Sequence, residues 1–305
     1  MAQTLDQFIK FTTDSVGLER TFRLLQSIAQ ILSSFTLPFE ILLYGISLTS
    51  YGPASPTAAR SVLFALRQHL ALTRRFFRLF RFIESFNSAQ KLYTSLSPPQ
   101  GPKAPAQPRW VQSEAWLNVF GRTFNGMYLM LEAATLIEAM QIEGFRIWSP
   151  EWERSITIEA QRFWLFSLVC GVFSGLMKVI EVLAYTPVPA TGDGFAHGKN
   201  EAKPAPEGEK DEKVDWDLKQ EQKRLRSIVQ DRKEGRAAWR GQVRSKISKL
   251  GRDVFANALD ITLPGSVVGW VKADAGTVGL AMFVTTILTS MDVWERCGNE
   301  VAVGK

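Results

Sequence analysis

The sequence contains few of the residues from which catalytic and metal sites are built. In 305 residues there are two histidines, His69 and His197, and two cysteines, Cys170 and Cys297. Two histidines provide almost none of the side chains that a histidine-based catalytic triad or a histidine-rich metal site requires. Two distant cysteines without a CxxC motif exclude a disulfide scaffold and a cysteine zinc site. Because GxGxxG and GxSxG are also absent, we expect no enzymatic activity, no cofactor and no metal ion.

The composition points to an apolar chain with an anionic partner. It is 46% apolar, with 20 Phe and 9 Trp, and carries a net charge of +6 with a pI near 9.3. A positive excess favours nucleic acid or an anionic membrane surface. Since no recognised nucleic-acid motif accompanies the charge, we expect an anionic phospholipid membrane as partner and no nucleic acid.

The periodicity of apolar residues predicts an all-α protein without convincing strands. The predicted class is a membrane-associated helical bundle with amphipathic interfacial helices and one or two marginal transmembrane helices. The chain is expected to form one domain with five regions: an amphipathic helical region (1–96), a Pro-rich linker (97–109), an apolar helical region (110–185), a disordered polar linker (186–215), and a basic helix followed by a hydrophobic segment (216–305).

Two segments approach the length that a membrane crossing requires. Residues 163–177 carry no charge, and extension to 185 adds only Lys178 and Glu181. Residues 275–291 also lack charge, and the segment continues to 294; at about 1.5 Å per residue its uncharged part is about 25 Å long, just under a bilayer core. We therefore predict possible spans at 163–185 and 275–294. The GxxxG spacing of Gly171 and Gly175 allows close helix approach.

The most informative stretch is TRRFFRLFRFIESF, residues 73–86. At about 100° per residue, a helix places apolar residues on one side, namely Leu72, Phe76, Leu79, Phe80 and Ile83, with Phe77 at the edge. The other side holds Arg74, Arg75, Arg78 and Arg81. Such a helix is typical of a membrane interface, where the apolar face inserts and the arginines reach phosphates. Periodicity alone equally allows a core-packing helix with a charged outer face.

Two other helices show a similar division of polarity. Residues 15–32 place an apolar stripe on one face, formed by Leu18, Phe22, Leu25, Ala29 and Leu32, and we expect Arg20, Arg23 and Gln26 to be turned away from the core. The basic segment 218–252 carries a stripe of Trp239, Val243, Ile247 and Leu250. A solvated charged helix and a helix that contacts anionic headgroups are both consistent with this segment.

Three stretches together resemble the peroxin-11 family, in its fungal-type form. The first has a Gly-x-Glu-Arg start and an Arg-Leu-Leu-Gln run, here Gly17, Glu19, Arg20, Arg23, Leu24, Leu25 and Gln26. The second resembles the family's basic amphipathic helix at Arg74, Arg75, Arg78 and Arg81. The third resembles its C-terminal segment at Asp260, Pro264, Gly276, Gly279 and Trp294, where the glycines imply helix packing. The resemblance runs from about residue 5 to 296.

The resemblance implies a protein of the peroxisomal membrane that elongates and remodels the membrane through an amphipathic helix, and so promotes peroxisome proliferation and fission. It also implies self-association as a homo-oligomer and contact with the division machinery, including a dynamin-related GTPase. An alternative is an oligomeric metabolite pore of the same membrane. The positive-inside rule favours a cytosolic location for segment 218–252, whereas two crossings would place it opposite the N-terminus.

Overall fold

The computed structural model describes residues 2–49, 55–96, 109–142, 144–185 and 211–303, and within them it contains eleven helices and no strand. The all-α prediction is therefore confirmed. The helices are α1 (Ala2–Thr13), α2 (Ser15–Ser34), α3 (Thr36–Thr49), α4 (Pro56–Arg78), α5 (Arg81–Leu96), α6 (Arg109–Ala134), α7 (Leu136–Ala139), α8 (Pro150–Tyr185), α9 (Asp211–Asp260), α10 (Thr262–Val268) and α11 (Ala275–Val303).

The chain divides into two compact units, which we describe separately. The first comprises Met1–Met177 and Gly251–Lys305, and the second comprises Lys178–Leu250. The second unit contains the end of α8 and most of α9. Along α9, the predicted stripe of Trp239, Val243, Ile247 and Leu250 is half-buried, while most of the polar side chains between them are exposed.

Two predicted linkers fall largely outside the described residues. Of the Pro-rich linker 97–109, only Arg109 is described, and it begins α6. Of the predicted disordered segment 186–215, residues 186–210 lie outside the described part. Its last five positions are helical, because α9 begins at Asp211.

Local sequence signals explain where the N-terminal helices begin. The Asp14 carboxylate accepts hydrogen bonds from the backbone N–H groups of Val16 and Gly17, at 3.1 and 3.0 Å, and so caps α2. A Cβ atom at Gly17 would lie 2.1 Å from the carbonyl oxygen of Phe11. Glycine therefore permits the close joint between α1 and α2. Proline 56, in the first turn of α4, fits a position where its missing N–H costs nothing.

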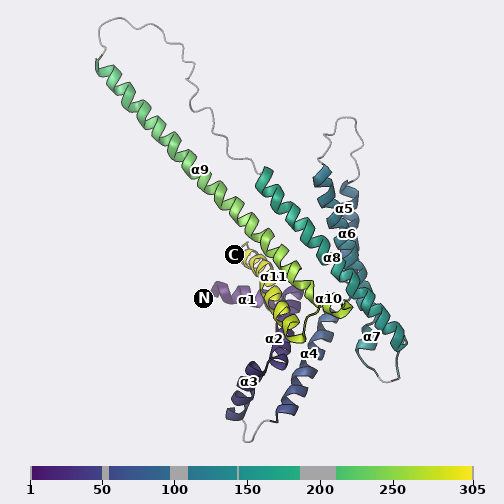
Figure 1. Ribbon diagram of the computed structural model, residues 1–305. Helices are drawn as coiled ribbons and strands as arrows, with labels where there is room; N and C mark the ends of the chain where they lie inside the picture. The colour runs from purple at the N-terminus through teal and green to yellow at the C-terminus, as the bar shows by residue number, and fades with distance from the viewer. Residues whose placement is uncertain (1, 50–54, 97–108, 143, 186–210, 304–305) are drawn as a thin grey trace. The chain divides into compact units, whose positions relative to one another are not determined.

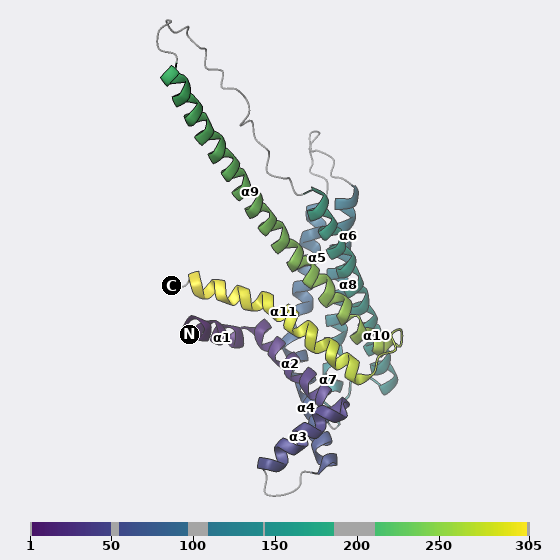
Figure 2. The same ribbon diagram turned by 60° about the vertical axis from the view of Figure 1, so that its left-hand side comes forward.

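In the first unit, the two ends of the chain pack together. Helix α2 contacts both α4 and α11, and α1 lies beside α11, so the N- and C-termini are close in both views (Figures 1 and 2). The Gln7 amide donates to the carbonyl oxygen of Trp294 at 2.8 Å, and Lys10 pairs with Glu300 at 3.3 Å. Residues more than 280 positions apart in the sequence are thus neighbours in space.

Helices α5 and α6 form a second packed pair in this unit, visible as adjacent ribbons in Figure 2. The Ser85 hydroxyl, near the start of α5, donates to the carbonyl oxygen of Arg122 in the middle of α6 at 2.8 Å. The first part of α8 packs on α6, where the rings of Tyr128 and Trp164 stack with centroids 5.2 Å apart. The contact between Ser85 and Arg122 thus joins residues on either side of the predicted linker 97–109.

Within the first unit, helix α2 buries several polar side chains and exposes a large apolar one. Helix α2 buries Glu19, Arg23, Ser27 and Gln30, whereas Leu25 is exposed. Our expectation that Arg23 turns away from the core is therefore wrong. The expectation placed the apolar stripe in the core, which is correct for a protein surrounded by water. Where lipid surrounds the protein, apolar side chains are favourable on the outside and polar ones on the inside.

Helix α11 has the same inverted polarity. Thr285 and Thr286 are fully buried, while Leu280 and Ile287 are exposed on the other side of the helix. In a bilayer, small and polar side chains favour helix–helix contact and large apolar side chains favour lipid contact. The distribution on α11 is therefore that of a membrane helix.

Two helices in the described part of the chain are long and apolar enough to cross a membrane. They are Pro150–Ala184, within α8, and α11, and they contain the predicted spans 163–185 (to Ala184) and 275–294. A third candidate is the pair formed by α2 and α3, which is bent by 99°. The predicted membrane-associated helical bundle is confirmed.

Candidate functional site

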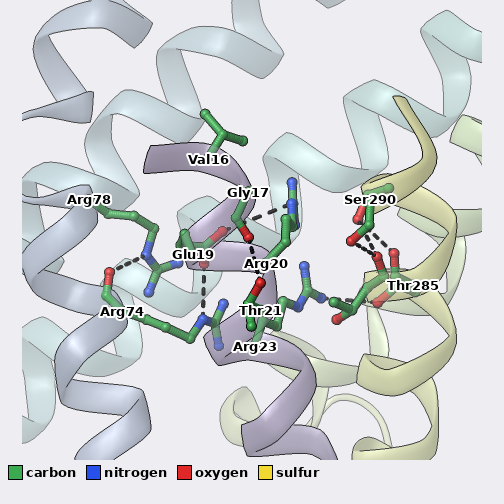
Figure 3. A network of polar contacts seen from close by, with 12 residues as sticks. Val16, Gly17, Glu19, Arg20, Thr21, Arg23, Arg74, Arg78, Thr285 and Ser290 are labelled. Carbon is green, nitrogen blue, oxygen red and sulfur yellow. Dashed lines mark hydrogen bonds and ion pairs between the residues drawn. The ribbon is translucent and has the colours of Figure 1, made fainter. Parts of the chain in front are cut away.

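An ion pair deep in the first unit joins α2 to α4. The Arg74 Nε donates to Glu19 Oε1 at 2.9 Å (Figure 3). The Arg74 Nη1 donates to the Gln26 side-chain oxygen at 2.7 Å. The side chains of Glu19 and Arg74 are 4% and 11% exposed. A buried charge pair of this kind is stable only when its hydrogen bonds are also satisfied, and Gln26 provides one of them.

A second ion pair joins α4 to α6. Arg78 Nη2 donates to Glu132 Oε1 at 2.8 Å, and its Nη1 donates to the Tyr128 hydroxyl oxygen at 3.2 Å. The same hydroxyl donates to Glu132 at 3.0 Å, which closes a three-membered network. Arg75 lies farther from Glu132, at 3.8 Å, and is more exposed than Arg78.

A third ion pair joins α2 to the end of α9 and to α11. Arg23 Nη2 donates to Asp260 Oδ1 at 2.5 Å and to the Thr285 hydroxyl oxygen at 3.0 Å. The Thr285 hydroxyl donates to the same Asp260 oxygen at 2.6 Å. Arg23 and Thr285 point toward one another in Figure 3. We call the three ion pairs Glu19–Arg74, Arg78–Glu132 and Arg23–Asp260 the arginine network.

Burial shifts the titration of two groups in this network. Loss of water around the Arg74 guanidinium, together with the nearby charge of Arg78, lowers the pKa of Arg74 to about 10. Burial raises the pKa of the Tyr128 hydroxyl to about 12, and the adjacent Glu132 carboxylate contributes to that rise. Both groups therefore keep their protons at neutral pH, so the network is ionic with a neutral phenol donor.

The predicted helix 72–86 differs from the structure in two respects. It is not continuous, because α4 ends at Arg78, a turn covers Leu79 and Phe80, and α5 begins at Arg81. The expectation of a single outward arginine face is also wrong for Arg74 and Arg78, which face the interior. The physical reason is that carboxylates on α2 and α6 are available there as partners.

The apolar side chains of the same stretch lie on the outside. Phe76 is 46% exposed, Phe80 is 71% exposed and Ile83 is 56% exposed, while Phe77 is partly covered by stacking on Phe22. We call Phe76, Phe77, Phe80 and Ile83 the apolar face. The other predicted membrane-binding residues, Leu72, Arg75, Leu79 and Arg81, are half-buried beside it.

The four glycines predicted for helix packing lie where another helix approaches. A Cβ at Gly175 would be 2.4 Å from a methyl carbon of Val254, and one at Gly171 would be 3.0 Å from the side chain of Asn257. On α11, a Cβ at Gly276 would meet the ring of Phe35 at 2.8 Å. One at Gly279 would meet the side chain of Gln30 at 3.1 Å. Any side chain at these positions would require a neighbour to move.

Two polar cavities lie next to the arginine network. Their volumes are about 420 and 390 Å³, and Arg74, Arg78, Tyr128 and Trp164 line both of them. An apolar groove of about 410 Å³ runs between α1, α2 and α11. Within the described residues no cluster of three or more His, Cys, Asp or Glu side chains is suited to hold a metal ion.

Sequence reasoning did not find the partners of the arginines. Glu132 and Asp260 are each separated from their arginines by more than 50 residues, and helical periodicity carries no information about such contacts. One signal was available, however. A charged residue inside an apolar helix is costly unless it is paired, and Glu132 lies within the apolar run Tyr128–Met140.

The comparison with protein families matches residues 5–294 to Peroxisomal biogenesis factor 11 (PEX11). The chain belongs to the PEX11 family. The resemblance predicted from three short stretches is thereby confirmed over nearly the whole chain. Neither the search of curated proteins nor that of solved structures returns a match.

Membership of the PEX11 family gives the broad biology of the chain. It is a peroxisomal membrane protein that takes part in peroxisome proliferation. Two apolar helices able to span a membrane are consistent with that location. The matched family is described as one of peroxisomal biogenesis factors.

Proposed function

We propose that this PEX11 family member remodels and elongates the peroxisomal membrane with the apolar face at residues 76–83, and so promotes peroxisome fission. The observation that carries the proposal is the exposure of Phe76, Phe80 and Ile83 beside a helix break. Aromatic side chains at this density are unfavourable in water. A bilayer interface would bury them.

The physical basis of the remodelling is shallow insertion. Side chains that enter only one leaflet expand that leaflet relative to the other, and the bilayer bends in response. In this arrangement Arg74 and Arg78 do not bind headgroups, because they anchor α4 to α2 and α6. Arg75 is more exposed than Arg74 and Arg78 and remains available to phosphates, contributing about 1 kcal/mol.

The experiment uses the full chain reconstituted into liposomes that contain anionic lipid. Replacement of Phe76 and Phe80 by Glu is expected to abolish tubulation while leaving the thermal unfolding temperature unchanged, because both side chains are exposed. The matched control is Phe145→Glu, which changes another exposed phenylalanine outside the apolar face. Tubulation retained by the double variant would overturn the proposal.

We also propose that the chain acts as a homo-oligomer and contacts the division machinery, including a dynamin-related GTPase. Membership of a family concerned with organelle proliferation supports this. Crosslinking in the membrane, followed by recovery with a dynamin-related GTPase from the same cells, tests both points. A chain that stays monomeric and recovers no GTPase would contradict them.

The second candidate is an oligomeric metabolite pore. It is favoured by the two cavities whose linings share Arg74, Arg78, Tyr128 and Trp164, since a path for a polar solute needs polar groups along it. The test is conductance across a planar bilayer by the purified chain. If Tyr128→Trp leaves any conductance unaltered, these cavities are not the path.

A further inference from the structure

The smaller of the two polar cavities, about 390 Å³, has an excess of positive charge. The charged side chains that line it are Arg20, Arg23, Arg74, Arg78, Arg81, Arg122, Glu19, Glu84 and Asp260. Arg23 and Arg74 are paired with Asp260 and Glu19, and Arg78 is paired with Glu132. Three arginines and Glu84 remain, so these side chains carry a net charge of +2 beyond the three ion pairs. We call this the cationic cavity.

Two of its arginines have unused hydrogen-bonding groups. Among the described residues, the buried Nε atoms of Arg20 and Arg23 have no hydrogen-bond partner. The Arg23 side chain is only 5% exposed. Arg20 is 3.9 Å from Glu19, beyond hydrogen-bond distance. A buried donor without a partner is unfavourable, and an anion in the cavity would satisfy these groups.

Arg20 also lines the apolar groove between α1, α2 and α11. The other residues of the groove are Phe11, Thr21, Leu24, Thr286, Ile287, Ser290, Met291, Trp294 and Glu295. Its volume of about 410 Å³ lies within the range of small-molecule sites, and its lining is mostly apolar. Arg20 thus lines both the apolar groove and the cationic cavity.

We infer that the first unit binds one anionic phospholipid, with its phosphate in the cationic cavity and an acyl chain in the groove. Charge complementarity selects the phosphate, because guanidinium groups donate in a planar fork that matches phosphate oxygens. The apolar groove favours a phosphate ligand that carries an acyl chain over inorganic phosphate. None of the four apolar-face residues, Phe76, Phe77, Phe80 and Ile83, lines the cavity or the groove, and occupation of the site does not depend on membrane remodelling.

The first arm of the test compares lipids on the full chain in non-ionic detergent. Native mass spectrometry would count the bound molecules of phosphatidylglycerol and of phosphatidylcholine with the same acyl chains. One phosphatidylglycerol per chain is expected to survive, with phosphatidylcholine bound at least about tenfold more weakly because it has no net charge. Equal retention of the two lipids would overturn the inference.

The second arm uses variants. Arg20→Gln with Arg81→Gln is expected to weaken phosphatidylglycerol binding by about tenfold or more. The control Arg154→Gln removes an exposed arginine outside the cavity and is expected to change nothing. If the double variant fails to fold, Arg122→Gln at the exposed edge of the cavity replaces it. Unchanged binding in the folded variant would contradict the site.

The third arm separates a lipid from a free anion or a second copy of the chain. Ile287→Asn changes the groove only and is expected to weaken phosphatidylglycerol binding. Inorganic phosphate alone is expected to protect the chain from thermal unfolding far less than the lipid does. Equal protection by phosphate would reject the lipid as occupant. A dimer of the chain without bound lipid in the native mass spectra would also reject it.

Discussion

Arg74 on α4 donates to Glu19 on α2 at 2.9 Å, inside the bundle of a membrane protein. The two residues belong to two of the three stretches that carry the family resemblance. A buried ion pair contributes little net stability compared with a well-packed apolar pair, and its best-attested role is to fix how the elements that carry it align. We infer that this pair sets the alignment of α2 and α4, and with it where the apolar face points.

Glu19→Leu is the direct test of this pair. The change leaves the Arg74 charge buried without its carboxylate, and removal of one partner from a buried pair costs about 3–5 kcal/mol. We expect a marked loss of thermal stability of the purified chain in detergent. Circular dichroism followed with temperature measures it.

The double variant Glu19→Leu with Arg74→Met is the control for that prediction. It removes both charges at once and is expected to recover most of the lost stability, because no unpaired charge remains. If the double variant is as unstable as the single one, the loss comes from packing and not from the unpaired charge.

Gly17→Ala tests why the first family stretch contains glycine. The added Cβ would lie 2.1 Å from the Phe11 carbonyl oxygen, so the joint between α1 and α2 must open. We expect loss of α1 docking, read as faster proteolysis of residues 2–13. Gly45→Ala is the matched control, because a Cβ there meets nothing within 4 Å. It should stabilise α3 by about 0.5–1 kcal/mol.

Thr285→Val tests the third ion pair with almost no change in volume. The valine removes a hydroxyl that accepts from Arg23 and donates to Asp260. Hydrogen bonds to charged groups contribute about 1.5–3 kcal/mol. Because Arg23 and Asp260 remain bonded to one another in the variant, a total loss of stability in that range is expected from chemical unfolding in detergent. Thr289→Val, whose hydroxyl donates only to backbone carbonyls of α11, should cost less. Equal costs would contradict a special role for Thr285.

Helices and membrane spans were predictable, because both depend on local composition. Uncharged runs such as 275–291 and the spacing of apolar residues gave the helices and the candidate spans. The helix break at Leu79–Phe80 was not predictable, because no glycine or proline marks it. The break follows from tertiary contacts, where Arg78 turns toward Glu132 while Phe80 turns outward.

The side on which Arg23, Arg74 and Arg78 lie was predicted wrongly for one reason. Amphipathic periodicity shows that two faces differ, but it does not say which of them is inside. In water the apolar face is inside, and Arg23 and Arg74 would be outside. In this protein both arginines meet carboxylates inside, and those carboxylates are far away in the sequence. The side of each arginine depends on these distant partners and on whether water or lipid surrounds the helix, and neither can be read from the local sequence.

The ion pair Arg23–Asp260 has a consequence for the order of synthesis. Its partners are 237 residues apart, and Thr285 is farther still. A ribosome that has made α2 must extend the chain almost to its last helix before the Arg23 charge is neutralised. Helix α2 can pack on α4 as soon as both are made, but its contact with α11 forms only when the chain is nearly finished.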